Sequence, residues 1–141
     1  MKKILFTLLA ISLFGCSSDD NSDHVGSIIG KWNFSTQKIT TNGVLINEGP
    51  YVGNEPGCEP DFIEFNEDHT AVAGDYSENC ELEAISSIYT LDRNILDLSY
   101  GPVDNMEFRI VTANETTLVL KSTSQNNGIT FVREAKFLKA Q

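Results

Sequence analysis

The feature that most constrains this fold is a regular succession of short, apolar-rich segments separated by turn signals. From residue 61 onward, stretches with alternating apolar and polar residues recur about every ten residues. Short polar turns separate them, at residues 66–69, 92–94, 113–115 and 126–128. The chain shows no convincing amphipathic-helix periodicity. This pattern predicts an all-β antiparallel meander, either a barrel or a sandwich.

Residue alternation gives the expected strands. We expect them over residues 31–40, 61–65, 70–76, 85–91, 95–100, 103–111, 116–122 and 129–139, with 44–46 as the start of a further one. About eight strands joined by short hairpins favour an up-and-down barrel, which removes its own edges. A Greek-key sandwich would need longer cross-connections than these turns supply.

The first strong strand signal is Gly30–Phe34, which contains the only tryptophan of the chain. Trp32 and Phe34 fall on one face of this strand, and Lys31 and Asn33 fall on the other. We therefore expect Trp32 to fill the closed end of the barrel. The same alternation predicts further inward-facing sets: Ile63 and Phe65; Tyr89 and Leu91; Leu96, Leu98 and Tyr100; Met106, Phe108 and Ile110; Leu118 and Leu120; Phe131 and Arg133.

Two interpretations of the barrel interior stay open at this point. An eight-stranded barrel is just wide enough to be filled by side chains or to hold one small ligand. If the interior is a packed core, the inward aromatic residues only stabilise the fold. If it is hollow, a pocket near the open end would be lined by Tyr51, Tyr89, Tyr100 and Phe108.

Residues 1–15 have the composition of a secretory leader. Two lysines follow the initiator Met1, and the apolar run at 4–14 is too short to span a bilayer as a helix. The segment 13–16 resembles the cleavage box of bacterial lipoproteins. This resemblance implies that Cys16 becomes the first mature residue and carries lipid, including an acyl chain such as palmitate. Several acyl chains on one residue hold a soluble domain firmly at a bilayer.

Residues 16–27 are expected to form the lipidated cysteine and an acidic, disordered tether, followed by the barrel at 28–141. The polar run after Cys16 is similar to the surface-export signal of lipoproteins from Bacteroidetes bacteria. That similarity implies a lipid-anchored protein of the outer membrane that faces the cell surface. A plain solvated tether, with the domain facing the periplasm, is the alternative.

Charge and cysteine content narrow the possible partners. Without residues 1–15 the chain has eight Lys and Arg against 20 Asp and Glu, a net charge of −12. This balance argues against nucleic acid as a partner, because phosphate binding needs clustered cations. The remaining cysteines, Cys58 and Cys80, are expected to form a disulfide in an oxidising compartment. A reactive or metal-binding pair is the competing interpretation, but neither histidine lies beside them, since His24 is in the expected tether and His69 is in a turn.

No catalytic motif is recognisable in the sequence. His24 lies in the expected tether and His69 in a turn, and no serine has the sequence context of a nucleophile. The sequence contains no glycine-rich phosphate loop. We therefore expect a monomeric protein that is not an enzyme and that uses no cofactor or metal.

Several motifs together resemble the lipocalins. These are Gly30-x-Trp32, Arg133 in the last strand, and the patterns within 61–70, 89–98 and 116–120. Over residues 28–138 the chain is similar to the short lipocalin-like lipoproteins of Bacteroidetes bacteria. The resemblance implies that Arg133 stacks on Trp32 and closes the barrel. It also implies a cup for a small apolar or amphipathic ligand.

The long segment 47–60 supports a different function. It contains three glycines and three prolines, and the expected disulfide at Cys58 would fix it to the domain. Loops of this length on a rigid scaffold commonly carry function. The alternative is therefore an interaction or inhibitor protein with a filled barrel, whose loop, with Tyr51, binds a protein or a glycan.

Overall fold

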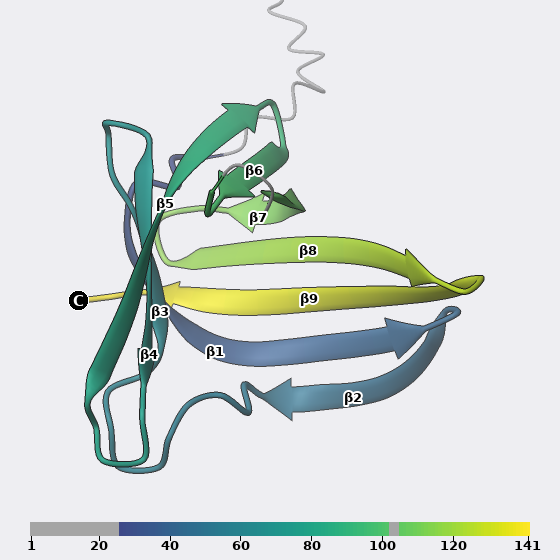
Figure 1. Cartoon of the computed structure of the whole chain (residues 1–141), viewed down its shortest axis with the longest axis horizontal. Helices are drawn as coiled ribbons and strands as arrows, with labels where there is room; N and C mark the ends of the chain where they lie inside the picture. The colour runs from purple at the N-terminus through teal and green to yellow at the C-terminus, as the bar shows by residue number, and fades with distance from the viewer. Residues whose placement is uncertain (1–25, 102–104) are drawn as a thin grey trace, which may run out of the picture.

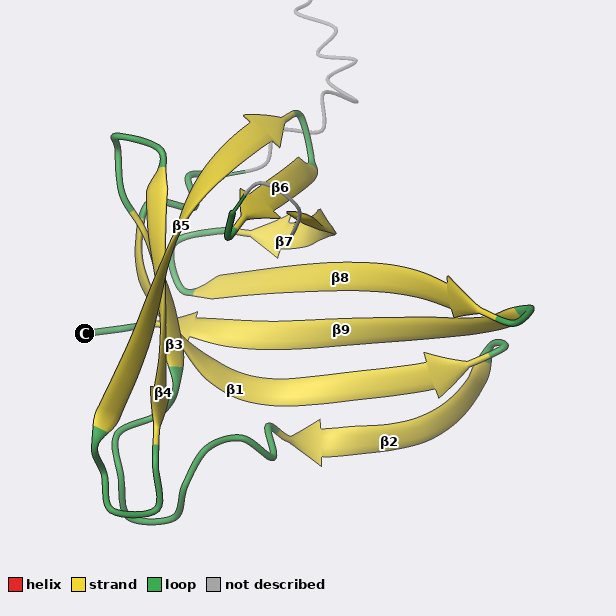
Figure 2. Cartoon of the chain, in the orientation of Figure 1, coloured by secondary structure: helices red, strands yellow, loops and turns green. Residues whose placement is uncertain are grey.

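The computed structural model describes residues 26–101 and 105–141. These residues form nine strands, coloured along the chain in Figure 1 and by secondary structure in Figure 2. They are β1 (Gly30–Thr41), β2 (Val44–Pro50), β3 (Phe62–Phe65), β4 (Thr70–Tyr76), β5 (Leu82–Asp92), β6 (Ile95–Ser99), β7 (Asn105–Ala113), β8 (Thr117–Asn126) and β9 (Ile129–Lys139). In the described ranges no helix is long and apolar enough to cross a membrane.

Eight of the strands close into an antiparallel barrel. Each strand from β3 to β9 pairs with the next, and β1 pairs with β3 on one edge and with β9 on the other. The ninth strand, β2, continues the edge of β1 beyond β3 and pairs with residues 36–41. The expected all-β, up-and-down barrel is therefore confirmed. The start of a strand expected at 44–46 is also confirmed, and this strand runs on to Pro50.

One side of the barrel is much longer than the other. The strands β8, β9, β1 and β2 run side by side and extend well past the crossing strands β3, β4 and β5 (Figure 1). The tips of the two long hairpins are joined: the Asn42 amide donates to the Thr130 carbonyl oxygen at 2.8 Å, and the Thr130 amide donates to Asn42 Oδ1 at 2.9 Å. The open end of the barrel therefore has one long lip.

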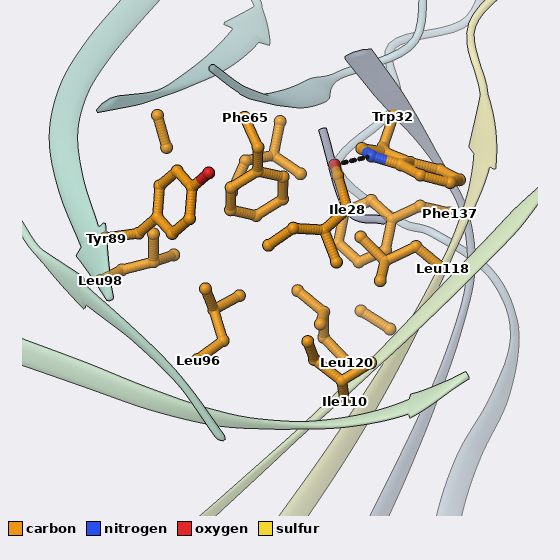
Figure 3. Close-up of a cluster of buried hydrophobic side chains, with 13 residues drawn as sticks. Ile28, Trp32, Phe65, Tyr89, Leu96, Leu98, Ile110, Leu118, Leu120 and Phe137 are labelled. Carbon is orange, nitrogen blue, oxygen red and sulfur yellow. Dashed lines mark hydrogen bonds between the residues drawn. The ribbon is translucent and has the colours of Figure 1, made fainter. Parts of the chain in front are cut away.

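A continuous apolar core occupies the closed half of the barrel (Figure 3). Trp32, Phe65, Leu96, Leu98 and Leu118 are its largest fully buried side chains. Burying a side chain of this size contributes about 1.5–3 kcal/mol. Most of the expected inward sets are confirmed as core: Trp32, Ile63, Phe65, Tyr89, Leu96, Leu98, Ile110, Leu118 and Leu120.

Leu91 keeps the expected inward phase, opposite Leu96 in the β5–β6 ladder, but it is not buried. It is 42% exposed because it lies beyond Ile88, the last residue of β5 that pairs with β4. Met106 and Phe131 keep the inward phase but are 48% and 40% exposed. Both lie near the open end, where fewer strands surround them.

The described chain starts with a contact at the closed end of the barrel. Gly26, which the sequence placed in the tether, donates its amide proton to the Ala113 carbonyl oxygen at 3.2 Å. Two residues assigned to the tether, 26 and 27, thus belong to the described chain at the closed end of the barrel. The remainder of the expected leader and tether, including Cys16, lies outside the described residues.

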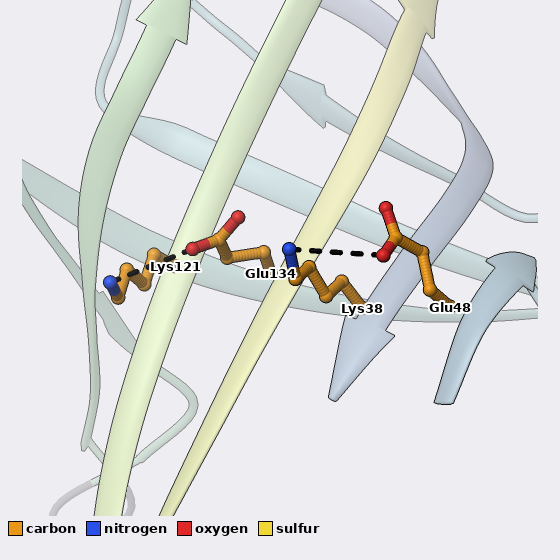
Figure 4. A network of polar contacts seen from close by, with 4 residues as sticks. All are labelled: Lys38, Glu48, Lys121 and Glu134. Carbon is orange, nitrogen blue, oxygen red and sulfur yellow. Dashed lines mark ion pairs between the residues drawn. The ribbon is translucent and has the colours of Figure 1, made fainter. Parts of the chain in front are cut away.

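Ion pairs lie on the outer face of the long lip (Figure 4). Lys38 and Glu48 are opposite each other on β1 and β2, with Nζ 3.8 Å from Oε2, and Lys121 and Glu134 are opposite on β8 and β9, with Nζ 3.5 Å from Oε1. Exposed pairs of this kind contribute only ~0–1 kcal/mol each. They support the strand register rather than the stability of the whole fold.

Candidate functional site

The open half of the barrel contains a cavity of about 190 Å³. Its wall includes five aromatic side chains: Phe34, Tyr51, Tyr100, Phe108 and Phe137. Two polar side chains, Ser122 and Arg133, lie on the β8 and β9 side. The cavity is thus a mostly apolar chamber with a polar region on one wall, which is the usual character of a small-molecule site.

The aromatic side of the cavity is built by β1, β9 and the residue after β2. The ring centroids of Phe34 and Tyr51 are 4.2 Å apart and the rings are stacked, and Phe137 contacts Phe34 at the same centroid distance. The Tyr51 amide donates to the Ser35 carbonyl oxygen at 3.0 Å, which fixes the backbone where the chain leaves β2. Tyr51 therefore forms a fixed part of the cavity wall.

Arg133 forms the polar region together with Gln37. Its Nη2 donates to Gln37 Oε1 at 3.1 Å, and its guanidinium lies 5.6 Å from the centroid of the Tyr51 ring. The Gln37 side chain is nearly inaccessible to solvent, with 3% of the residue exposed. A bulge in β1 between Phe34 and Thr36 turns Gln37 toward the same face as Ala135.

The tyrosines at the mouth are held in their neutral form. Burial raises the pKa of Tyr51, and the positive charge of Arg133 offsets only part of that rise. Burial also raises the pKa of Tyr100, and the negative charge of Asp75 adds to the rise. At neutral pH both phenols therefore keep a proton that they can donate in a hydrogen bond.

Three of the four expected ligand-binding residues line this cavity: Tyr51, Tyr100 and Phe108. Tyr89 does not. Its ring packs edge-on against Phe65 at 5.2 Å, and its hydroxyl donates to the Asn66 carbonyl oxygen at 2.9 Å near the closed end. Tyr89 is a core residue whose polar atom is satisfied.

Sequence reasoning missed four residues of the cavity wall, namely Ala73, Ser122, Ala135 and Phe137, and it also missed Gln37, which binds Arg133. Phe137 could have been found, because it continues the alternation that places Phe131 and Arg133 inward. Gln37 could not have been found, because the direction of its side chain depends on the bulge in β1, and no local sequence signal predicts that bulge.

The closed end is capped by Trp32 and Lys139, which corrects the expected role of Arg133. The indole Nε1 of Trp32 donates to the Ile28 carbonyl oxygen at 2.6 Å (Figure 3), and the Lys139 ammonium lies 4.2 Å from the centre of the indole ring. The same ammonium donates to the Ile29 carbonyl oxygen. In the antiparallel ladder Trp32 pairs with Lys139, whereas Arg133 pairs with Ile39, too far along β1 to reach the indole.

Gly30 makes this cap possible. Its φ of +111° is unfavourable for any residue with a side chain, and a Cβ atom there would overlap the Lys139 side chain. The Gly-x-Trp spacing therefore has a structural cause, since the glycine leaves room for the cation that covers the tryptophan.

A disulfide fastens the open end. Cys58 and Cys80 are bonded, as expected, and join the β2–β3 connection to the β4–β5 connection. Within the same connection, Asn54 donates to the Phe34 carbonyl oxygen at 2.9 Å and accepts from the Asp61 amide at 3.0 Å. The irregular segment is residues 51–61 rather than 47–60, because β2 continues to Pro50.

No catalytic constellation lies among the described residues. His69 is in the β3–β4 turn, where its ring contacts the Tyr89 ring at 5.4 Å. Across ranges 26–101 and 105–141, no three His, Cys, Asp or Glu side chains are grouped so that they could hold a metal ion.

Comparisons with known proteins agree with this geometry. The sequence profile of the lipocalin-like domain family matches residues 28–120. A lipocalin-like protein from Bacteroides uniformis superposes with a TM-score of 0.56 at 15% identity, covering 82% of this chain and all of the other. Lobster apocrustacyanin A1 superposes with a TM-score of 0.52 at 15% identity, covering 86% of this chain and 63% of the other.

A search among curated proteins gives no significant match. A protein from Bacteroides eggerthii also shares the fold, with a TM-score of 0.54 at 11% identity over 81% of this chain and all of the other. At these identities the solved structures establish the fold, and the profile match over most of the barrel establishes the family. The chain belongs to the lipocalin-like domain family.

Proposed function

We propose that this protein is a non-enzymatic binding protein of the cell envelope that holds one small apolar or amphipathic ligand in the cavity at the open end of its barrel. The main observation behind this proposal is the aromatic-walled cavity of about 190 Å³. Lipocalin-like barrels form a family that binds small hydrophobic ligands, which supports the same use of this cavity.

The size of the cavity limits the ligand. An apolar protein cavity of ~150 Å³ binds benzene, whereas drug-sized ligands occupy pockets of ~300–1,000 Å³. The expected ligand therefore has an apolar body of about one ring with a short chain. The stacked rings of Phe34 and Tyr51 offer a flat apolar surface to such a body.

Protein-observed NMR titration with the neutral compound 3-phenylpropanamide tests this function. We expect saturable shifts of amides on the strands around the cavity. Ala73→Leu, which fills the cavity, should weaken binding by roughly tenfold or more, equivalent to about 1.4 kcal/mol. The matched control is Val72→Leu on the same strand, since Val72 lies on the outer face. Equal affinity in the two variants would rule out the cavity as the site.

A lipid anchor at Cys16 would give this site a defined orientation. The described chain begins at the closed end, where Gly26 contacts Ala113. Nine residues lie between Cys16 and Gly26, and the ten steps from one Cα to the next span at most ~35 Å when extended. An anchored protein would therefore hold its closed end near the outer membrane and its mouth away from the bilayer, on the cell surface or, as the alternative, in the periplasm.

The fastened loop 51–61 supports a second candidate function, recognition of a protein or glycan. Val52 is 77% exposed on this loop, next to a backbone fixed by hydrogen bonds and the disulfide. Tyr51, which was expected to serve such contacts, instead turns into the cavity. Val52→Asp separates the two functions, because it should leave binding of 3-phenylpropanamide unchanged and disrupt only contacts made by the loop.

A further inference from the structure

We propose that the ligand is a monoanion, whose carboxylate binds Arg133 while its apolar body occupies the cavity. This inference rests on the proposed function, since it assigns the chemical class of the ligand for the same cavity. It follows from the position of Arg133, from the groups around it, and from the negative charge across the mouth.

The guanidinium of Arg133 has donors to spare. An arginine carries five N–H donors, and this side chain donates to Gln37 and interacts with the Tyr51 phenol, which leaves further donors free. The ion pairs found among the described residues are Lys38–Glu48 and Lys121–Glu134, so Arg133 has no carboxylate partner there. Arg133 is solvent-exposed where it lines the cavity, and its free donors are available to a carboxylate whose apolar body enters the cavity.

The surroundings of Arg133 hold the guanidinium ready for a carboxylate. Gln37 is buried and fixes one end of the fork, while the face of Tyr51 lies beneath the guanidinium. A planar guanidinium with a restricted orientation can bind a carboxylate through two parallel hydrogen bonds. Ser122 lies directly opposite Arg133 in the β8–β9 ladder and adds a hydroxyl to the same wall.

The other side of the mouth carries a negative charge. Asp75 continues the alternation of Ala71 and Ala73 on β4, and its charge acts on both Tyr51 and Tyr100. A second negative group on the ligand would meet this carboxylate. The arrangement therefore favours a single negative charge at Arg133 and disfavours a dianion.

Four compounds with the same apolar body test the inference by calorimetric or NMR titration at neutral pH and low salt. They are 3-phenylpropanoate, the neutral 3-phenylpropanamide, the cation 3-phenylpropylamine and the dianion 2-benzylmalonate. We expect the carboxylate to bind at least roughly tenfold more tightly than the amide. The cation and the dianion should bind more weakly than the monoanion.

Two charge variants assign this preference to Arg133. In Arg133→Gln the affinity for the carboxylate should fall to that for the amide, while amide affinity stays within about twofold, since only the charged contact is lost. Arg109→Gln is the matched control, because this substitution removes the same charge from the outer face of β7, away from the cavity. Asp75→Asn should raise the affinity for the dianion.

The outcomes separate the two proposals. If neither the amide nor the carboxylate binds, the proposed function fails and this inference fails with it. If the amide binds but the carboxylate binds no better, or if the carboxylate preference survives Arg133→Gln, the cavity is a ligand site and only the anion assignment is overturned.

Discussion

Lys139 lies over the indole ring of Trp32 and thereby joins the end of the last strand to the start of the first. Its ammonium is 4.2 Å from the ring centre and also donates to the Ile29 carbonyl oxygen. Because Trp32 and Lys139 are direct partners in the β1–β9 ladder, this contact closes the barrel at the point where its two ends meet.

The cap at the closed end should be measurable as stability. Lys139→Met is expected to lower the free energy of unfolding by about 1–3 kcal/mol, combining a lost cation–π contact with a lost hydrogen bond. Trp32→Ala should cost about 3–5 kcal/mol because it leaves a large cavity in the core. Urea denaturation followed by circular dichroism measures both. The comparison is Arg133→Met, which loses only the hydrogen bond to the buried Gln37 and is expected to cost about 1 kcal/mol; a larger loss there than at Lys139 would contradict this assignment of the cap.

Removal of the disulfide should destabilise the fold through the unfolded state. The bond closes a loop with a sequence separation of 22, so the double variant Cys58→Ser/Cys80→Ser should lose about 3 kcal/mol in the chain-entropy model. Thermal unfolding with and without a reductant measures this loss. Reductant should lower the Tm of the parent protein and leave that of the double variant unchanged. A parent protein indifferent to reductant would show that the bond contributes little.

Asp61 should make stability depend on pH in the acidic range. Burial raises the pKa of its carboxyl above the ordinary value of 3.8, and the bond that Oδ1 accepts from the Tyr76 amide offsets part of the rise. The folded state therefore holds this proton to higher pH than the unfolded state. Stability contributed by Asp61 thus falls as pH rises from 3.8 through the folded pKa, and is constant above it.

The variant Asp61→Asn isolates this effect, since its amide oxygen can still accept from the Tyr76 amide. Relative to the parent protein, it should gain stability as pH rises from about 3 to 7. Urea midpoints measured across this range give the difference. A difference that shrinks with rising pH would reverse the sign and refute the buried-carboxyl explanation.

Tyr89 and Tyr51 should separate stability from ligand binding. Tyr89→Phe removes a hydrogen bond to the Asn66 carbonyl oxygen and should cost about 1 kcal/mol of stability, with no change in affinity for 3-phenylpropanamide. Tyr51→Ala removes a stacked wall of the cavity and should weaken that affinity. NMR titration paired with denaturation checks both, and an affinity loss in Tyr89→Phe would return Tyr89 to the binding site.

Membrane attachment depends on Cys16 in our proposal. Cys16→Ser should move the protein from the membrane fraction to the soluble fraction and abolish incorporation of labelled palmitate, because the lipidated residue is gone. Cys58→Ser is the control, since it removes a different cysteine and should leave labelling intact. Labelling that persists in Cys16→Ser would place the lipid elsewhere.

Much of the fold was predictable because its determinants are local. Alternation places Trp32, Phe65 and Leu118 on the inner face, and turn-forming residues separate the strands. The pairing of Cys58 with Cys80 followed from their being the two cysteines outside the leader region. Tyr51, Tyr100 and Phe108 were also correctly grouped near the open end.

The errors arose where residues far apart in sequence determine one another. Arg133 was paired with Trp32 on resemblance, although antiparallel strands join the start of one to the end of the other. Because Trp32 lies near the start of β1, its partner must lie near the end of β9, where Lys139 is the cation. Leu91 has the inward phase but lies beyond the part of β5 that pairs with β4. How far β4 extends along β5 cannot be deduced from the segment that contains Leu91.

The sequence by itself thus determined the class of fold, the inward and outward faces of the strands, and the disulfide. Strand alternation and turn-forming residues act within short stretches of chain, and two cysteines outside the leader region leave one possible pairing. Only the tertiary structure decided which cation caps Trp32, which way Gln37 turns, and that a chamber of about 190 Å³ stays open beside Arg133. These depend on ladder register, a bulge and the sum of side-chain volumes around the barrel, all of which arise when distant strands meet.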